Sequence, residues 1–243
     1  MHFVAIPAGA SVVGDHRGTP DEWTERAVNI SEPFWLGVCE VSNSQYACFD
    51  PLHDSAYMDA RNKDRITRGY PVNKPDQPVV RISFAEAQAF CAWLSERSGR
   101  LCQLPSEDEW EHACRAGTAT PWPFGDALPA GRQNLANIAD ASLNRWGWGR
   151  CEKDYNDGSM FTMPIGKTIP NRWGLYDMIG NVAEWTDSPY AGNDSLRVVR
   201  GGSWNDRAIQ ARSASRWRYP RWQPVYNVGF RVKIAMRQAA PNP

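Results

Sequence analysis

A dense motif of this chain is PNRWGLYDMIGNVAEW, residues 170–185. Two further dense motifs accompany it, LPSEDEWEHACRAG at residues 104–117 and the interrupted run VVRGGSW…RSASR…NVGFRV over residues 198–232. In that run, Gly201 and Gly202 permit positive φ angles and close backbone approach, so we expect them and Arg200 to shape the fold. The segment NVGFRV is typical of a closing strand whose Phe and Val side chains enter the core.

Outward from these motifs, short alternations of apolar and polar residues predict strands at Phe3–Ile6, Ala27–Ile30 and Phe34–Val41. Three serines are each followed three positions later by Gln or Glu, which is the pattern of the capping box at a helix start. They predict helices that begin after Ser42, Ser83 and Ser106. Ser98-Gly99 predicts the end of the second helix.

Long irregular segments separate these elements. Residues 50–76 are rich in charge and proline without a sustained period, and we expect a surface loop there. Residues 117–166 are rich in Asn, Asp and Gly, which favours a functional or metal-stabilised loop. The pattern indicates one loop-rich α+β domain over residues 1–243, with a flexible tail at 236–243.

The composition excludes several classes of function. Lys and Arg total 27 and Asp and Glu total 27, and this balance argues against nucleic-acid binding, which rests on a basic excess. The apolar runs are too short for a membrane span or a secretory signal. We therefore expect a cytoplasmic protein, or a secreted or periplasmic one if a leader has been trimmed, and a monomer.

Cysteine and histidine offer little for a local metal site. The six cysteines contain no C-x-x-C pair, and the four histidines contain no H-x-x-x-H or H-x-E pair. An iron or zinc centre would have to be assembled from residues far apart in the sequence. The twelve tryptophans are the unusual feature, and they indicate a compact core, a binding face, or both.

Together the three motifs, with the opening IPAG and the segment EVSNSQY, resemble the formylglycine-generating enzyme, or sulfatase-modifying factor, superfamily. The resemblance runs from Phe3 to Val232. It implies the C-type-lectin-like fold of the formylglycine-generating-enzyme type, an α+β domain with little regular secondary structure, long loops and a surface groove.

The resemblance also implies two structural calcium sites. One would use the side chains of Asn137 and Asp157 with the backbone carbonyls of Ile138 and Ser159. The other would use Asp177 and Glu184 with the carbonyls of Gly180 and Val182. Oxygen donors of these kinds suit Ca²⁺. The alternative is that the same residues cap turns without a metal.

The chain departs from the founding enzyme of the family at its catalytic centre. That enzyme resembles a copper-dependent oxidase with two cysteines, five residues apart, shortly after the RGGS segment. Here Asp206 and Ala211 occupy those positions, and no cysteine follows Cys151. Because cuprous ions prefer sulfur, the sequence argues against a copper site and against formylglycine formation by that route. Ala183, which replaces a groove tryptophan of the family, also puts the usual substrate groove in question.

Arginine and aromatic residues alternate where the cysteines are missing, and this composition is typical of binding hot spots. We take Ser203 and Asp206 as candidate catalytic residues. The candidate ligand-binding residues are Arg115, Trp204, Asp206, Arg207, Trp217, Tyr219, Trp222 and Tyr226. Asp206 and Arg207 could instead form a salt bridge that shapes the loop.

Three functions follow from these observations. The first is a divergent protein whose groove binds a peptide, a protein or a small molecule. The second is a non-heme metal-dependent oxidase, or a sulfatase-maturation-type enzyme of altered chemistry, in which Asp206 could bind iron. The third is a retroelement-diversified ligand-binding protein. The sequence leaves open whether the chain is an enzyme.

Overall fold

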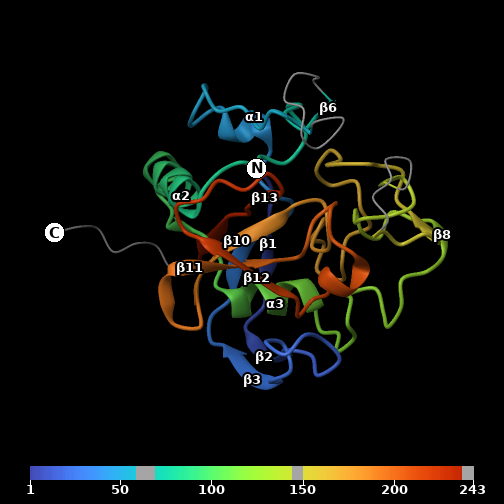
Figure 1. The fold of residues 1–243 in the computed structure, drawn as a ribbon. Helices are drawn as coiled ribbons and strands as arrows, with labels where there is room; N and C mark the ends of the chain where they lie inside the picture. Colours follow the sequence, from blue (N-terminus) through green and yellow to red (C-terminus); the bar gives the residue numbers. More distant parts are fainter. Residues whose placement is uncertain (59–68, 144–149, 237–243) are drawn as a thin grey trace.

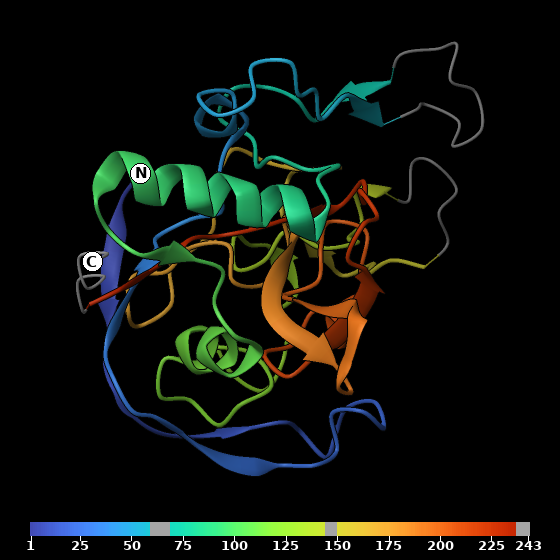
Figure 2. The same ribbon diagram turned by 90° about the vertical axis from the view of Figure 1, so that its left-hand side faces the viewer.

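The computed structural model describes residues 1–58, 69–143 and 150–236. It is a mixed α+β fold in which short strands and three helices are joined by long irregular segments. Figures 1 and 2 both show the layers in the same order, with α1 and α2 above the central strands and α3 and the β2–β3 hairpin below them. The predicted tail at residues 236–243 lies, apart from Met236, outside the described residues.

Two four-stranded sheets form the centre. One has the order β1-β4-β14-β7, and its strands are Phe3–Ile6, Phe34–Gly37, Lys233–Ala235 and Cys102–Gln103. The other has the order β12-β11-β10-β13, and its strands are Arg216–Pro220, Asn193–Arg200, Ala183–Tyr190 and Val228–Gly229. In this second sheet β11 runs antiparallel to both β10 and β12, whereas β13 lies parallel to β10. The second sheet thus joins two of the three motifs, residues 170–185 and 198–232.

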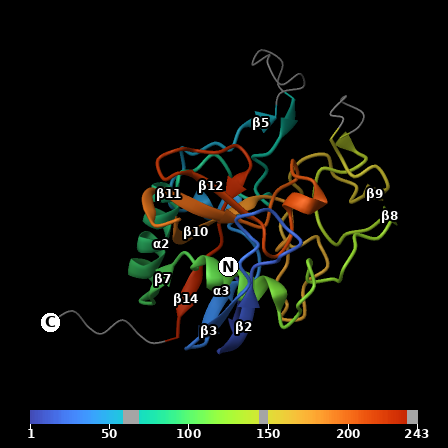
Figure 3. The ribbon, with the colours of Figure 1, turned by 60° about the horizontal axis from the view of Figure 1, so that its bottom comes forward.

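The remaining strands form three two-stranded pairs. The β2–β3 hairpin joins Gly9–Val13 to Arg26–Ile30, and Figure 3 shows it beside α3. Within the predicted loop at residues 50–76, the structure adds β5 (Tyr57–Met58) and β6 (Tyr70–Pro71), while residues 59–68 lie outside the described part. Residues 117–166 are irregular as predicted, apart from the parallel pair β8 (Gly131–Arg132) and β9 (Tyr155–Asn156); residues 144–149 are not described.

All three predicted helix starts are confirmed as capping boxes. In each, the serine hydroxyl accepts from the backbone N–H three residues on, and the Gln or Glu side chain there accepts from the serine N–H. The helices are α1 (Asn43–Tyr46), α2 (Phe84–Ser98) and α3 (Glu107–Arg115), and a 3₁₀ turn, η2, covers Ala208–Gln210. Helix α2 ends at Gly99 in the left-handed conformation, as predicted.

The predicted strand Phe34–Val41 is shorter than expected. It ends at Gly37, because the chain then leaves the edge of β14 and the Val41 N–H donates to the Phe230 carbonyl instead. Phe230 and Val232 are fully buried, as expected of the closing segment. Trp110, Trp185 and Trp204 are also fully buried, so part of the tryptophan excess belongs to the core. Among the described residues, none of the helices is long and apolar enough to cross a membrane.

Candidate functional site

The segment that follows β11 is held in place by Arg200. Its guanidinium is fully buried, donates to the carbonyls of Ser213, Ala214 and Ser215, and pairs with Glu111 on α3. The two glycines after it have positive φ angles of 91° and 68°, which lets the chain turn sharply out of the strand. The structure therefore confirms that this part of the motif serves the architecture, and it fixes where residues 203–215 lie.

Ser203, Asp206 and Asn227 form a hydrogen-bonded cluster at the start of this segment. Ser203 Oγ donates to Asp206 Oδ2 at 2.6 Å, and Asn227 Nδ2 donates to Ser203 Oγ at 2.8 Å. Next to them, Asn205 Nδ2 donates to the Tyr226 hydroxyl at 2.8 Å. The structure thus brings together both candidate catalytic residues and one predicted ligand-binding tyrosine. Sequence reasoning did not assign Asn205 and Asn227 to the site.

Burial changes the acid–base properties of this cluster. It raises the pKa of Asp206, although the hydrogen bonds from Ser203 oppose the effect. Burial also raises the pKa of Tyr226 to about 12 and that of Tyr219, and the negative charge of Asp206 adds to both shifts. The two tyrosines therefore lie close enough to Asp206 to sense its charge.

The alternative pairing of Asp206 with Arg207 does not form. Arg207 turns away and pairs with Glu152, with its Nε 3.1 Å from the Glu152 carboxylate. Asp206 instead uses its backbone carbonyl to accept from Ala139 N–H and its side chain to accept from Ser203. Arg207 is exposed, so it remains a candidate for contact with a ligand.

The aromatic face consists of Trp217, Tyr219, Trp222 and Tyr226, all from β12 and the loop after it. Trp222 is 72% exposed, Trp217 is 37% exposed and Tyr226 is 36% exposed. Tyr219 is half-buried against the ring of Trp185. Beside Trp217, a cavity of about 380 Å³ lies between residues 19–22 and the side of β12 that carries Arg216 and Arg218. In this cavity the Arg216 and Arg218 guanidinium groups lie over the Tyr190 ring.

Two of the predicted ligand contacts need correction. Arg115 is only 3% exposed, because its guanidinium pairs with Glu111 and donates to the carbonyls of Gly14 and Thr120. Trp204 is fully buried, and its ring packs edge-on against two others. The distance between ring centroids is 4.7 Å to Phe161 and 6.1 Å to Tyr226. Arg115 anchors the turn after β2, and Trp204 supports Tyr226 from beneath. The sequence could not distinguish these roles, because burial of both side chains depends on contacts with distant residues.

The first predicted calcium site has donors suited to a hard cation. Asn137 is fully buried, and its Oδ1 has no hydrogen-bond partner among the described residues. Asp157 is also buried; burial, followed by the charge of Asp140, raises its pKa to about 8. Its carboxylate accepts from the backbone N–H groups of Ile138 and Ser159, so Asp157 lies against two of the other predicted residues. A buried carboxylate and an unpaired amide oxygen are donors of the kind that Ca²⁺ takes.

The second predicted site contains an acid that sequence reasoning missed. Glu184 pairs with Arg231 through two hydrogen bonds of 2.6 and 2.7 Å and accepts from the Trp110 indole. Asp177 is satisfied by Thr168 and the Gly166 N–H. Glu40, however, is 1% exposed, and neither of its carboxylate oxygens has a partner among the described residues. Burial raises its pKa well above the ordinary value, and Asp177 and Glu184 add to the shift.

Two of the three buried acids, Glu184 and Glu40, act on the buried Arg231, and Asp177 acts on Glu40, so a divalent cation would balance the excess negative charge. The donor set at the second site fits such an ion best when Glu40 is included. The available signal was a glutamate between buried strand residues and a capping box, in LGVCEVS at residues 36–42. That signal shows only that a charged residue, Glu40, interrupts an apolar run. It does not show that Asp177 and Glu184 lie near Glu40, because they are brought there by contacts between distant segments.

Gly180 links the two predicted calcium sites. Its φ angle is 82°, and a Cβ at this position would overlap the backbone carbonyl of Asn137. The adjacent Asn181 N–H donates to that same carbonyl at 2.7 Å. Residues 177–182 therefore pack tightly against residues 137–138, and this contact joins the two predicted calcium sites.

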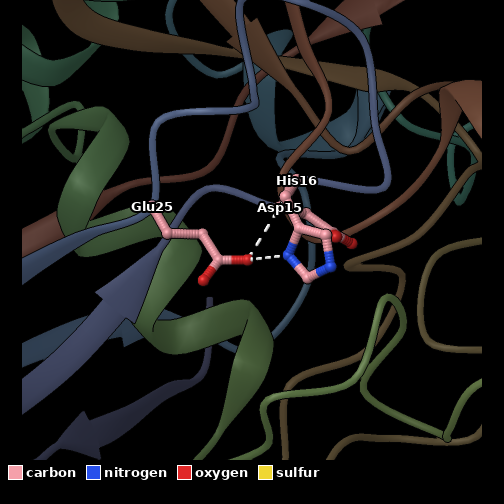
Figure 4. Close-up of side chains that lie close together, drawn as sticks. All are labelled: Asp15, His16 and Glu25. Atoms are coloured by element: carbon pink, nitrogen blue, oxygen red, sulfur yellow. Dashed lines mark hydrogen bonds and ion pairs between the residues drawn. The ribbon is translucent and has the colours of Figure 1, made fainter.

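One further cluster of potential metal ligands lies outside these sites. Among the described residues, Asp15, His16 and Glu25 are the one group of three His, Cys, Asp or Glu side chains whose ligand atoms lie within 4.8 Å of one another. Figure 4 shows the His16 ring and the Glu25 carboxylate pointing toward each other, with 2.5 Å between Nδ1 and Oε1. Asp15 already accepts from Arg17 and Arg212. Because the acids are already paired, the cluster stabilises the loop at residues 14–25.

The chain is similar to known proteins in both sequence and fold. The chain matches the family described as sulfatase-modifying factor enzyme 1-like domain over residues 1–236. It is 38% identical to the inactive C-alpha-formylglycine-generating enzyme 2 of Bos taurus over 56% of this chain and 41% of that protein. It is 31% identical to the formylglycine-generating enzyme of Thermomonospora curvata over 83% of this chain and 82% of that one.

Among solved structures, PvdO from Pseudomonas aeruginosa superposes with a TM-score of 0.76 at 26% identity, covering 96% of this chain and 94% of PvdO. Treponema denticola variable protein 1, at 21% identity and a TM-score of 0.71, shares the fold. These similarities confirm the C-type-lectin-like fold expected from the motifs. The chain spans less than half the length of the first mammalian relatives that it matches.

Proposed function

The chain belongs to the family of sulfatase-modifying factor enzyme 1-like domains, and we propose that it is a divergent member that binds a ligand on the aromatic face. The observation that carries the proposal is the exposure of Trp222 and Trp217 in the segment where the catalytic cysteines are missing. Large rings exposed to solvent on β12 and in the loop after it supply contact area at low entropic cost.

The same segment argues against formylglycine formation by the copper–dithiol route. Asp206 and Ala211 stand where the resemblance places the two cysteines, and the methyl group of Ala211 is fully buried. A carboxylate and a methyl group supply no thiolate for cuprous ion. The similarity to a mammalian protein named as inactive agrees with this proposal.

A non-heme metal oxidase is the second candidate, because the chain is also 31% identical to a protein named hercynine oxygenase from Mycolicibacterium thermoresistibile, over 70% of this chain. In the part of the chain that the structure describes, however, the one cluster combining histidine with two carboxylates is Asp15, His16 and Glu25. It does not include Asp206. Ligand binding therefore ranks above metal-dependent oxidation, and a retroelement-diversified protein has no observation beyond the shared fold in its favour.

Two structural calcium ions complete the proposal. Asn137, Asp157 and the carbonyls of Ile138 and Ser159 would hold one, and Asp177, Glu184, Glu40 and the carbonyls of Gly180 and Val182 would hold the other. When bound, the ions would neutralise buried carboxylates and stiffen the loops that support the aromatic face. The unpaired Asn137 and Glu40 oxygens support this assignment.

The binding proposal is tested by selecting peptides from a random displayed library on the immobilised full chain. Selected peptides should bind the wild type and compete with one another, because one surface holds them. A control variant, Leu52→Ala, removes a side chain that is 94% exposed outside the face and should leave binding unchanged. If the selected peptides bind equally well to a Trp217→Ala/Trp222→Ala double variant, the aromatic face is not the binding surface.

The catalytic part is tested separately by mass spectrometry. A cysteine-containing sulfatase peptide is incubated with the chain, oxygen and cuprous ion, and conversion of cysteine to the aldehyde is measured. We expect no conversion above that of the peptide with copper alone. Conversion that depends on the protein would contradict the proposal.

A further inference from the structure

Among the described residues, Asp206 has no ion-pair partner, whereas three arginines of its own segment are each paired with an acid. Arg207 pairs with Glu152, Arg212 pairs with Asp15 and Glu22, and Arg216 pairs with Glu107. In the described parts of the chain, no ion pair includes Asp206, and its side chain accepts hydrogen bonds from the neutral residue Ser203. A carboxylate withdrawn from water without a cation is costly to keep ionised.

From this arrangement we propose that the Asp206 carboxylate binds an ammonium or guanidinium group of the ligand. The inference rests on the proposed function, since it names the chemistry that the aromatic face recognises. The missing positive charge would arrive with the ligand, as a lysine or arginine side chain of a peptide or as a free organic amine. Both sources share one chemistry, a cation with several N–H donors.

The polar side chains around Asp206 are arranged to accept such donors. Ser203 donates to Oδ2 of Asp206 and is itself fixed by Asn227, so the carboxylate is held in one orientation. Asn227 is 5% exposed, and its Oδ1 has no hydrogen-bond partner among the residues that the structure describes. The Asn227 side chain is linked to Asp206 through Ser203, and its amide oxygen provides a second acceptor for a ligand with more than one N–H group.

Two rings complete the environment of the carboxylate. Tyr219 and Tyr226 both lie within reach of the charge of Asp206, and Tyr226 is 36% exposed, so the site can be reached from solvent. The Tyr226 hydroxyl is occupied by Asn205, and its ring is supported by Trp204. Electron-rich ring faces attract cations, which adds to the attraction of the carboxylate.

The experiment measures binding of charged and uncharged probes to the full chain by ligand-observed NMR. The probes are N-acetylated, C-amidated Gly-Lys-Gly and Gly-Arg-Gly, the same tripeptides with norleucine or glutamate in the centre, and n-butylammonium and n-butylguanidinium. We expect the cationic probes to bind about tenfold more tightly than the norleucine peptide. The Asp206→Asn variant should abolish this preference. The control Asp194→Asn removes a carboxylate that is 85% exposed and should retain it.

The outcomes separate this inference from the proposed function. Tighter binding of the lysine or arginine peptide than of the free amines assigns the cation to a peptide, and equal affinity assigns it to a small amine. Equal binding of cationic and norleucine probes, or no binding of the cationic probes at millimolar concentration, overturns the inference. If Trp222→Ala weakens binding of the neutral or acidic probe while Asp206→Asn does not, the aromatic face binds a ligand but does not recognise a cation. If no probe and no selected peptide responds to Trp222→Ala, the proposed function itself fails.

A stability measurement checks the premise that Asp206 has no partner within the chain. Without ligand, Asp206→Asn should not lower the midpoint of thermal unfolding, because no ion pair is lost. A clear decrease would show that another part of the chain supplies the cation, and it would overturn the inference.

Discussion

Asp206 shows how a single replacement changes the chemistry available on a retained scaffold. Its neighbours Ser203 and Asn227 hold it by hydrogen bonds, and the buried Arg200 fixes the backbone nearby. At the position where the resemblance places a cysteine, the chain therefore presents an oriented carboxylate. This carboxylate can attract a cation, but it cannot replace a thiolate at a cuprous ion.

The pH dependence of stability should reveal the partly buried Asp206 carboxylate. Because burial raises the folded-state pKa of Asp206 above its unfolded value, the unfolded chain releases this proton first as the pH rises. Asp206 therefore lowers stability as the pH rises through that interval. We expect Asp206→Asn to be more stable than the wild type at neutral pH, with the difference vanishing below the unfolded pKa of about 4. Urea unfolding at several pH values measures this, and a difference independent of pH would contradict it.

Gly180 should be the least replaceable glycine near the proposed calcium sites. Gly180→Ala must place a Cβ against the Asn137 carbonyl at a φ of 82°, so we expect a loss of at least about 2 kcal/mol in the free energy of unfolding. Gly192 is a matched control, since its φ is 74° but a Cβ there meets nothing within 4 Å. Gly192→Ala should therefore cost about 1 kcal/mol. Equal losses in urea titrations would show that the contact with Asn137 is not tight.

At the scale of elements, local patterns predicted what local physics decides. The capping boxes at Ser42, Ser83 and Ser106 were visible in the sequence because each uses residues three positions apart. The strand Phe3–Ile6 was predicted with its correct bounds. The burial of Trp204 and Arg115 was missed, and so was the acid Glu40, because their surroundings are built from segments far apart in the chain.

The loop at residues 14–25 should depend on one buried ionic cluster. Arg212 pairs with Asp15 and Glu22, and all three side chains are at most 3% exposed. Arg212→Ala would leave the buried Glu22 carboxylate without its ion-pair partner and Asp15 with Arg17 alone, so we expect a loss of about 3–5 kcal/mol in the free energy of unfolding. The control Arg26→Ala breaks the more exposed pair with Asp108 and should cost no more than about 1 kcal/mol. Similar losses for the two variants would show that the cluster is not buried in solution.

At the scale of the whole molecule, the two central sheets and three helices position the long loops, which have little regular secondary structure of their own. The family could be recognised from the motifs at residues 104–117, 170–185 and 198–232, and with it the fold. The ligand could not be predicted from the sequence, because the exposure and the ion pairs of side chains at the aromatic face depend on how these motifs pack together.

Calcium should stabilise the whole molecule if the buried carboxylates hold it. At a free concentration well above the dissociation constant, we expect the midpoint of thermal unfolding to rise by about 5 °C relative to protein in chelator. Asp157→Asn should reduce the rise, and Glu40→Gln should reduce it independently, because they belong to different sites. Differential scanning calorimetry with and without calcium measures the effect. An unchanged midpoint in the wild type would argue that these residues only cap turns.

Ligand binding on the aromatic face, which we propose for this chain, is tested by one affinity ratio. A peptide selected on the wild type is titrated calorimetrically against the wild type and against the Trp217→Ala/Trp222→Ala double variant. Because exposed tryptophans at a binding face carry much of the affinity, we predict a loss of at least about tenfold with the fold intact. Unchanged affinity for the double variant would contradict the account.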